Sequence, residues 1–499
     1  MILLGLFVAL SACGSIWVAY AFAVSGTGDL FNTDLIQPYM IVRDTVIHAG
    51  SFLAWQYSPA NYVFPDLFIA GLLYLVGVPW LWLPIAYAGV LLAAYGTLFG
   101  IVSEAVQPGA AVGFTFVATL ILAAFLAAAA SDISHPGSLL AIYLVSSYIH
   151  TGAILAGLVA LALAIRCLSS TERVLAYRVL LVISVVTSFS DLLYLLWFVA
   201  PIAIVWLLLA RARADRALRK QGIILVASSA IANLLDRLLR APGGLERDIQ
   251  QTIANLWQGF VIGPLAGDWV MAIVTVSTLL MALSGAPLLF RLLRRQELTR
   301  LQMALLMITG VQWAAIVAPA ASGQFVSIVH LRYALPIFVL PVLWFMLLAS
   351  NWLLPRLRTA VAWVGAAVLA TVSAMTFSTG LSAAEALMRP HPVVGCVSGL
   401  GRVAGYSDYW LSKLTTFSTD YRMTVVPLVE DGSLHRASMN LRWLDRTADG
   451  TQPFAPTFVI MERLDPAKIR ERFGAPGEVV DCGSSEVWLY DHSLPVVRP

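Results

Sequence analysis

The residues of this chain that could do chemistry gather first in and beside the stretch 25–63. They are Asp29, Asp34, Asp44, His48 and Asp66. A carboxylate within hydrogen-bonding reach of a hydroxyl is the usual general base for making that hydroxyl nucleophilic. These side chains are therefore candidates for holding or deprotonating an acceptor, with Asp34 and Asp29 the first choices. A solvated loop residue for Asp29 and a helix N-cap for Asp34 are the alternatives that require no activity.

Further ionisable side chains interrupt the later apolar stretches, at Asp132, His135, His150 and Asp191. Such residues inside or beside membrane helices are costly, and they mark function by default. Polar turns between helices explain Asp132, His135 and Asp191 equally well. A hydrogen-bonded core residue in the middle of a helix is the simpler interpretation of His150. No pair has the spacing of a metal site, such as His-x-x-x-His. No cofactor is therefore certain, and a divalent cation would rest on carboxylates alone.

A third group is His330-Leu331-Arg332-Tyr333-Ala334-Leu335-Pro336, where an arginine begins an apolar stretch. A guanidinium forks onto phosphate through two parallel charge-assisted hydrogen bonds. Arg332, with His330 and Tyr333 beside it, is thus a candidate site for an anionic phosphate. Attraction of Arg332 to lipid head groups is the alternative.

The composition decides what kind of elements must position these residues. Of the 499 residues, 59% are hydrophobic and 12% are charged, and the mean hydropathy is +0.82. Soluble domains carry roughly 25% charged residues, so this chain needs lipid to cover its apolar surface. A net charge of +3 gives no reason to expect a nucleic-acid partner.

Apolar segments near the length that crosses a bilayer, about 20 residues, recur along the chain. They lie near 1–24, 66–78, 80–103, 111–130, 138–164, 174–189, 193–210, 221–235, 265–290, 301–318, 333–350 and 359–379. No Lys or Arg occurs before Arg43, so the basic n-region of a signal peptide is missing, and we expect residues 1–24 to be a retained helix and not a cleaved signal. We expect a mostly α polytopic bundle of about 11–13 transmembrane helices over residues 1–379.

Arginine clusters orient the later segments, because positive loops stay in the cytoplasm. They place residues 380–499 outside, and they also place 236–264 outside although that loop carries three arginines. The first third is ambiguous. Loop 25–63 lies outside if 66–103 crosses once with a re-entrant or tilted piece, and the rival orientation makes that loop cytoplasmic. Apolar residues at helical spacing over 34–48 suggest a helix lying on the membrane surface.

Residues 380–499 differ in texture and predict a small soluble α+β domain. Short β-like runs occur at 423–426, 458–461 and 487–490, with helical patterning over 466–472 between them. Asp431-Gly432 and Asp449-Gly450 are turn pairs. Outside the cytoplasm, Cys396 and Cys482 can form a disulfide. We expect that disulfide, with two separate buried thiols as the alternative.

The combination of an acidic first loop, Tyr62-Val63-Phe64-Pro65-Asp66-Leu67, the Arg332-Tyr333-x-x-Pro336 helix start and an outer domain resembles the GT-C superfamily of membrane glycosyltransferases. Gly405-Tyr406-Ser407-Asp408-Tyr409-Trp410 and the two cysteines resemble outer domains attached to some members. The resemblance implies inverting transfer of a sugar from a polyprenyl-phosphate donor to a lipid, glycan or protein acceptor. The site would lie at the outer face of the inner (plasma) membrane.

Under that resemblance Asp34 looks like the first-loop acid, Asp132 is the nearest second acid, and Arg332 faces the lipid phosphate. The first loop departs from the family pattern in having no Asp-x-Asp, since Asp29 and Asp34 are separated by four residues. A transporter or flippase of a lipid-linked or small solute is the alternative function. The chain shows no convincing internal repeat of the kind that many transporters carry, and a large outer domain suits an enzyme better.

Overall fold

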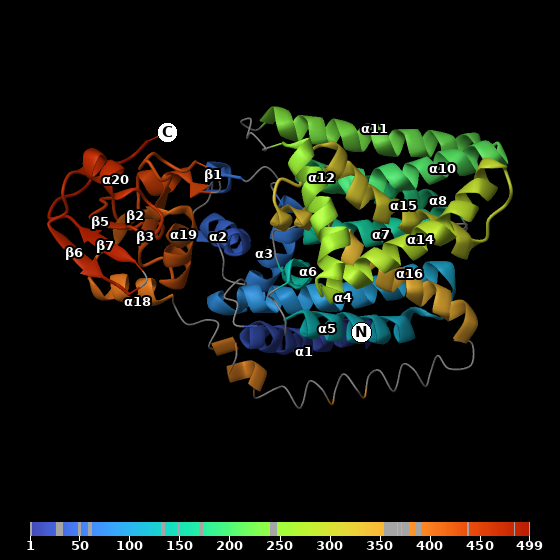
Figure 1. Cartoon of the computed structure of the whole chain (residues 1–499), viewed down its shortest axis with the longest axis horizontal. Helices are drawn as coiled ribbons and strands as arrows, with labels where there is room; N and C mark the ends of the chain where they lie inside the picture. The colour runs from blue at the N-terminus through green and yellow to red at the C-terminus, as the bar shows by residue number, and fades with distance from the viewer. Residues whose placement is uncertain are drawn as a thin grey trace. The chain divides into compact units, whose positions relative to one another are not determined.

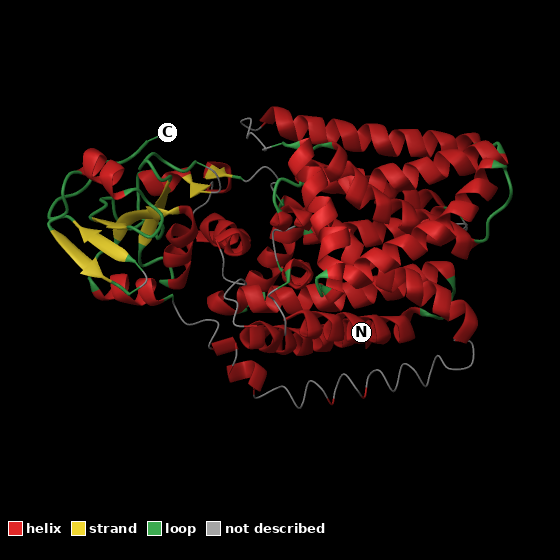
Figure 2. Cartoon of the chain, in the orientation of Figure 1, coloured by secondary structure: helices red, strands yellow, loops and turns green. Residues whose placement is uncertain are grey.

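The computed structural model of the chain describes residues 2–25, 33–47, 51–57, 62–130, 135–146, 150–168, 173–239, 247–353, 367, 371, 379–382, 384–385, 391–436, 439–483 and 485–498. The chain forms two compact units. The helical unit comprises Met1–Ser25, Tyr62–Pro65 and Tyr87–Leu381. The mixed unit comprises Gly26–Asn61, Asp66–Ala86 and Ser382–Pro499. The predicted fold class is confirmed, because helices dominate and the strands form a small sheet region in the mixed unit (Figure 2).

The helical unit is built from α-helices joined by short 3-10 and π segments (Figure 1). Its α-helices are α1 (Ile2–Ser25), α4 (Leu83–Val106, from Tyr87), α5 (Ala111–Ala130), α6 (Pro136–Ile142), α7 (Thr151–Cys167), α8 (Arg173–Ser190), α9 (Leu192–Tyr194), α10 (Ala200–Arg213), α11 (Arg216–Leu239), α12 (Ile249–Trp257), α13 (Gly263–Leu265), α14 (Trp269–Leu293), α15 (Arg300–Ala321) and α16 (Pro336–Leu353). The short segments are η5 (Tyr143–Val145), η6 (Leu195–Val199), η7 (Gln258–Ile262) and η8 (Ile328–Ala334), and η3 (Val63–Leu67) begins in this unit.

Within the described residues, seven helices are long and apolar enough to cross a membrane. They are Trp80–Val106, Ala111–Ala130, Arg173–Ser190, Leu192–Arg213, Trp269–Leu293, Arg300–Ala321 and Arg332–Ala349. Shorter apolar helices occur at Phe7–Tyr20, Val63–Leu75, Pro136–Val145 and Thr151–Cys167. An apolar helix of this length satisfies its own backbone hydrogen bonds, as lipid requires. The chain is therefore an integral membrane protein.

The segment 138–164, expected as one membrane helix, is interrupted. α6 continues into η5, which ends at Val145, and Ser146 has an extended backbone. α7 begins only after His150. His150 itself has a left-handed backbone with φ of 61°, so it does not lie in the middle of a helix as we expected. The apolar sequence of 138–164 favours a continuous helix, and the side-chain contacts of His150 described below act against it. The expected segment 359–379 lies almost wholly outside the described residues.

The mixed unit combines a five-stranded sheet with helices from both ends of the chain. Its N-terminal elements are α2 (Thr33–Ile47), η2 (Ser51–Ala54), β1 (Trp55–Gln56), α3 (Phe68–Leu75) and η4 (Trp80–Trp82). Its C-terminal elements are α18 (Pro392–Gly399), β2 (Ala404–Asp408), α19 (Tyr409–Ser418), β3 (Thr424–Leu428), β4 (Met439–Asn440), η9 (Leu441–Leu444), β5 (Phe458–Ile460), α20 (Pro466–Phe473), β6 (Glu478–Asp481) and β7 (Glu486–Leu489).

The sheet has the strand order β3-β2-β5-β7-β6, and β1 and β4 form a separate antiparallel pair. β2 is parallel to β3 and β5, whereas β7 is antiparallel to β5 and β6. α19 is the crossover helix that parallel neighbours such as β2 and β3 require. A core of buried apolar residues, including Val425, Phe458 and Val487, packs this sheet against α18 and α19. The predicted Cys396–Cys482 disulfide is confirmed and joins α18 to the residue after β6, with the Cα atoms 5.7 Å apart.

α2 confirms the predicted helix over 34–48, but not its expected contact with lipid. Ile36, Tyr39 and Met40 are at most 1% exposed, because α2 packs against α19 and α3 within the mixed unit. The apolar face that we expected on a membrane surface is therefore covered by protein.

Candidate functional site

A buried histidine and a buried aspartate contact each other in the helical unit. His150 precedes α7, and its Nδ1 lies 2.5 Å from Oδ2 of Asp191, the residue between α8 and α9. The other carboxylate oxygen of Asp191 accepts a hydrogen bond of 2.9 Å from the backbone N–H of Leu193, which caps α9. Both side chains are at least nine-tenths buried. Because both Asp191 oxygens are engaged, the imidazole of His150 is held in one orientation.

The second nitrogen of this histidine faces a tyrosine. Nε2 of His150 lies 3.2 Å from the hydroxyl of Tyr62. With an ionised Asp191 and a neutral His150, the contact places the proton on Nδ1 and leaves the lone pair on Nε2, because a carboxylate accepts hydrogen bonds and cannot donate them. Tyr62 then donates to Nε2. His150 is thus arranged as an oriented proton acceptor.

Aromatic rings enclose the imidazole of His150. The rings of Tyr62, Trp197 and Tyr333 lie edge-on to it, with ring centroids 5.2, 5.8 and 5.5 Å from that of His150. His330 stacks on Tyr333 at 5.4 Å, with an interplanar angle of 8°. The guanidinium carbon of Arg332 lies 5.6 Å from the centre of the Tyr333 ring. We call these seven residues, namely Tyr62, His150, Asp191, Trp197, His330, Arg332 and Tyr333, the histidine cluster.

The histidine cluster lies at the ends of helices that carry arginines at their other ends. α7 starts after His150 and has Arg166 in its last turn. α8 runs from Arg173 toward Asp191, and the helix that follows Asp191 ends with Arg211 and Arg213. The structure therefore brings together Asp191, His330, Arg332 and Tyr333, which are candidates from separate stretches of the sequence.

Asp34 lies in the first turn of α2, in the mixed unit. It accepts a hydrogen bond from the hydroxyl of Tyr409 on α19. Nζ of Lys413 donates to Gln37 at 3.1 Å and to the Tyr409 hydroxyl at 3.3 Å. Burial lowers the pKa of Lys413 to about 7, although the charge of Asp34 opposes that shift. Asp34 is thus part of a polar contact between α2 and α19.

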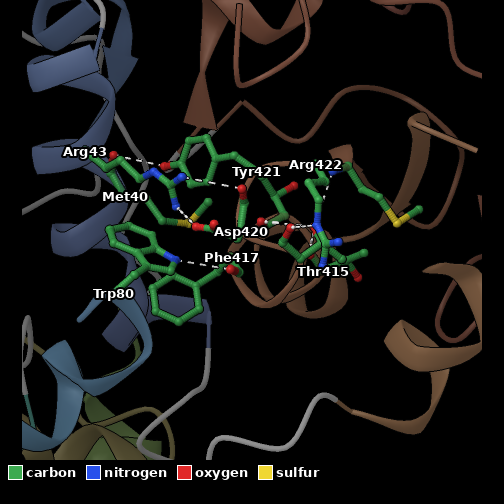
Figure 3. Close-up of polar contacts among 11 residues, drawn as sticks. Met40, Arg43, Trp80, Thr415, Phe417, Asp420, Tyr421 and Arg422 are labelled. Atoms are coloured by element: carbon green, nitrogen blue, oxygen red, sulfur yellow. Dashed lines mark hydrogen bonds and ion pairs between the residues drawn. The ribbon is translucent and has the colours of Figure 1, made fainter.

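Arg43 anchors the other end of the same contact (Figure 3). It forms an ion pair with Asp420, and its guanidinium carbon lies 4.7 Å from the ring centre of Trp80 and 4.4 Å from that of Tyr421. The indole N–H of Trp80 donates to the carbonyl of Phe417 at 3.2 Å. The Tyr421 hydroxyl donates to the carbonyl of Met40 at 3.1 Å. Charge and stacking together hold α2 in place here.

Asp44, another candidate from the first loop, is buried in the mixed unit. Nδ2 of Asn440 donates to its carboxylate at 2.6 Å. Burial raises the pKa of Asp44 to about 7, while the hydrogen bond from Asn440 acts in the opposite direction. This environment gives Asp44 a structural position between α2 and β4.

The remaining candidates are dispersed or undescribed. Asp66 is buried in the mixed unit, and His135 is the residue before α6. Asp29, His48 and Asp132 lie outside the described residues. Asp34 and Arg332 belong to different units. Among the residues that the structure describes, no group of three His, Cys, Asp or Glu side chains could hold a metal ion.

Sequence reasoning placed four members of the histidine cluster among its candidates but did not connect them. Tyr62 and Trp197 were not chosen as site residues, and His150 was interpreted as a core residue. The only sequence signal for the pair is that two ionisable residues interrupt apolar stretches, 41 positions apart. Tyr409 and Lys413 were also missed. Their spacing of four residues places them on one face of a helix.

Comparison with known proteins adds no identification. No protein-family model, curated protein or solved structure matches this chain.

Proposed function

We propose that this protein is a membrane glycosyltransferase that transfers a sugar from a polyprenyl-phosphate donor to an acceptor hydroxyl at the outer face of the membrane. One observation carries the proposal. The histidine cluster gathers a cationic side chain, Arg332, and an oriented proton acceptor, His150, around aromatic rings at one end of membrane-spanning helices. A lipid-linked phosphate would enter such a site from the bilayer with its charged end at the helix ends.

The residue types fit the requirements of the reaction. The acceptor oxygen attacks the anomeric carbon, and the bond from that carbon to the phosphate oxygen breaks. One displacement inverts the configuration. The leaving phosphate carries its own charge, so an arginine that stabilises it matters more than a general acid. Aromatic faces such as those of Tyr62 and Tyr333 suit the apolar face of a sugar ring, and they exclude water.

An apolar groove in the helical unit supports a lipid-linked donor. It has a volume of about 480 Å³ and lies among α10, α14 and α15. Its lining is almost entirely apolar and includes Leu196, Ala200, Ile204, Ala282 and Leu306. Leu196, which directly precedes Trp197 of the histidine cluster in the sequence, is one of its lining residues. An isoprenoid chain in this groove would be covered by apolar side chains.

Charge and the disulfide support the outer location. The arginine-rich helix ends favour the cytoplasm, which leaves the histidine cluster at the opposite ends. The Cys396–Cys482 disulfide suits an oxidising compartment, where the mixed unit would then lie.

The test is transfer by the purified full-length protein in proteoliposomes. Radiolabelled polyprenyl-phosphate hexoses and pentoses serve as donors, and a membrane extract supplies acceptors. Arg332→Lys keeps the charge but loses the planar fork, so we expect a higher KM for the donor and a lower kcat. Arg211→Lys, at the exposed arginine-rich end of α10, is the matched control and should transfer normally. Movement of labelled lipid across the bilayer without any transfer would instead identify a transporter or flippase.

A further inference from the structure

We infer that His150, oriented by Asp191, takes the proton from the acceptor hydroxyl, and that Asp34 is a positioning residue for α2. The inference rests on the proposed function, because it assigns the base of that reaction. It departs from the resemblance described above, which gives the role of base to Asp34.

The hydrogen-bond geometry of His150 is that of an activated base. A general base needs a lone pair directed into the site and a partner that stabilises the positive charge it acquires. Nε2 supplies the lone pair, and Asp191, 2.5 Å from Nδ1, supplies the partner. Since Asp191 also caps α9 through the N–H of Leu193, its carboxylate cannot rotate away from the imidazole without releasing that cap.

The backbone on both sides of this contact is held in an uncommon conformation. Tyr62 and His150 have φ angles of 50° and 61°, in the left-handed region that residues with a Cβ rarely adopt. Such conformations persist where the surrounding structure imposes them, and they concentrate at functional sites. Here the two strained residues are the two partners of one hydrogen bond, 3.2 Å long.

The Tyr62 hydroxyl marks the position of the acceptor hydroxyl. It lies 3.2 Å from Nε2 of His150, and with the proton on Nδ1 it donates to Nε2 as an acceptor O–H would. In the reaction the acceptor O–H proton moves to Nε2, the new bond forms from the acceptor oxygen to the anomeric carbon, and the electron pair of the broken bond leaves with the phosphate. Asp191 stabilises the imidazolium, and Arg332 the phosphate. Tyr62 must therefore yield its place on Nε2 when the acceptor binds.

Asp34 has a different environment. Its carboxylate accepts from Tyr409, which also contacts Lys413, and neighbouring Thr33 donates to the carbonyl of Trp410. These contacts all join α2 to α19. These hydrogen bonds account for Asp34 through a structural role, the fixing of α2 on α19.

The experiment uses His150→Gly in the full-length protein. Glycine removes the base and prefers the left-handed backbone at this position, so the variant should fold. It leaves a space of imidazole size among the rings of Tyr62, Trp197 and Tyr333. We expect kcat to fall by roughly 100-fold or more, with little change in KM for the donor, and to recover as imidazole is added.

Two comparisons make the rescue specific. 1-Methylimidazole has no N–H for Asp191, so it should restore much less activity than imidazole. His492→Gly, at an exposed histidine of the mixed unit, should transfer normally and show no response to imidazole. Asp191→Asn keeps an oxygen for the Leu193 cap but favours the wrong tautomer of His150, so it should be as slow as His150→Gly and should not be rescued.

The outcomes separate the two proposals. Undiminished transfer by His150→Gly, or loss of transfer without any rescue by imidazole, would overturn the assignment of His150. Asp34→Asn keeps an oxygen for the Tyr409 hydroxyl, so it should lose less activity than His150→Gly, and the reverse order would return the base to Asp34. Absence of transfer by the wild-type protein would overturn the proposed function, and this inference with it.

Discussion

Two buried ionisable residues of the mixed unit have pKa values displaced toward neutrality from opposite directions. Burial raises the pKa of Asp44 to about 7 and lowers that of Lys413 to about 7. Burial disfavours the charged form in both cases, which is why an acid and a base move in opposite directions. The ionisation of both residues therefore changes within the physiological pH range, and the stability of the mixed unit should depend on pH there.

The sign for Asp44 follows from its raised pKa. Between about pH 4 and 7 the folded protein holds a proton on Asp44 that the unfolded chain releases. The free energy of unfolding therefore decreases as the pH rises through that window. The free energy of unfolding falls by at most roughly 4 kcal/mol across this window, at about 1.4 kcal/mol for each pH unit. Arg43 and Tyr421 also face this carboxyl.

We expect Asp44→Asn to flatten the decline in stability of the mixed unit between pH 5 and 7. The amide oxygen can still accept from Asn440 but does not ionise. Thermal unfolding of the full-length protein in detergent, followed by tryptophan fluorescence, measures the slope. Asp431→Asn, on an exposed turn, is the control and should keep the wild-type slope. A slope in Asp44→Asn equal to that of the wild type would refute the role of this carboxyl.

At the scale of elements, α2 is held on the C-terminal part of the mixed unit by contacts along its whole length. Thr33, Asp34 and Gln37 contact α19 near one end, Arg43 contacts Asp420 and Tyr421 further along, and Asp44 contacts Asn440 beyond them. Arg43 differs from the other contacts in being stacked on two aromatic rings, because Trp80 and Tyr421 both face its guanidinium.

Arg43→Lys should weaken this attachment by about 1–2 kcal/mol, since lysine keeps the charge but cannot stack on two rings. The melting temperature of the mixed unit should fall accordingly. The matched control is Arg498→Lys, which alters an exposed ion pair with Asp445 that should contribute little. Equal melting temperatures for the two variants would show that the stacking of Arg43 contributes no more than an exposed ion pair.

At the scale of the whole molecule, one compact unit contains residues from the first loop and from the C-terminal 118 residues, Ser382–Pro499. Segments that pack in one unit through side-chain contacts cannot lie on opposite sides of a bilayer. In a membrane, α2 and β1 of the first loop would therefore share a side with the C-terminal strands and helices of the mixed unit. If the arginine clusters are cytoplasmic, as the positive-inside bias predicts, this favours the orientation with loop 25–63 outside over its rival.

Labelling of single cysteines tests that arrangement. In spheroplasts of cells that make variants without Cys13 and Cys167, a membrane-impermeant thiol reagent should modify Val46→Cys and Val429→Cys, whose native side chains are both exposed. Glu297→Cys, between α14 and α15 at their arginine-rich ends, should react only after permeabilisation. Modification of only one of Val46→Cys and Val429→Cys would contradict their placement in one compact unit. Protection of both, with Glu297→Cys labelled, would refute the outer location.

Composition and local periodicity were enough to predict the fold class, most of the spanning helices, the strands β3, β5 and β7 and the Cys396–Cys482 disulfide. These features depend on runs of neighbouring residues, or on an oxidising compartment and the presence of only two cysteines in one domain. Apolar runs predict membrane helices whatever they later pack against, because lipid forces each such helix to satisfy its own backbone.

Only the tertiary structure decided where the polar residues meet. The His150–Asp191 contact and the packing of α2 on α19 join residues 41 to 376 positions apart. The amphipathic pattern of α2 could not show that its partner is protein and not lipid, because both bury the same apolar face. A histidine in an apolar stretch has the same local sequence whether it is a core residue or an oriented base, and its partners across the fold make the difference.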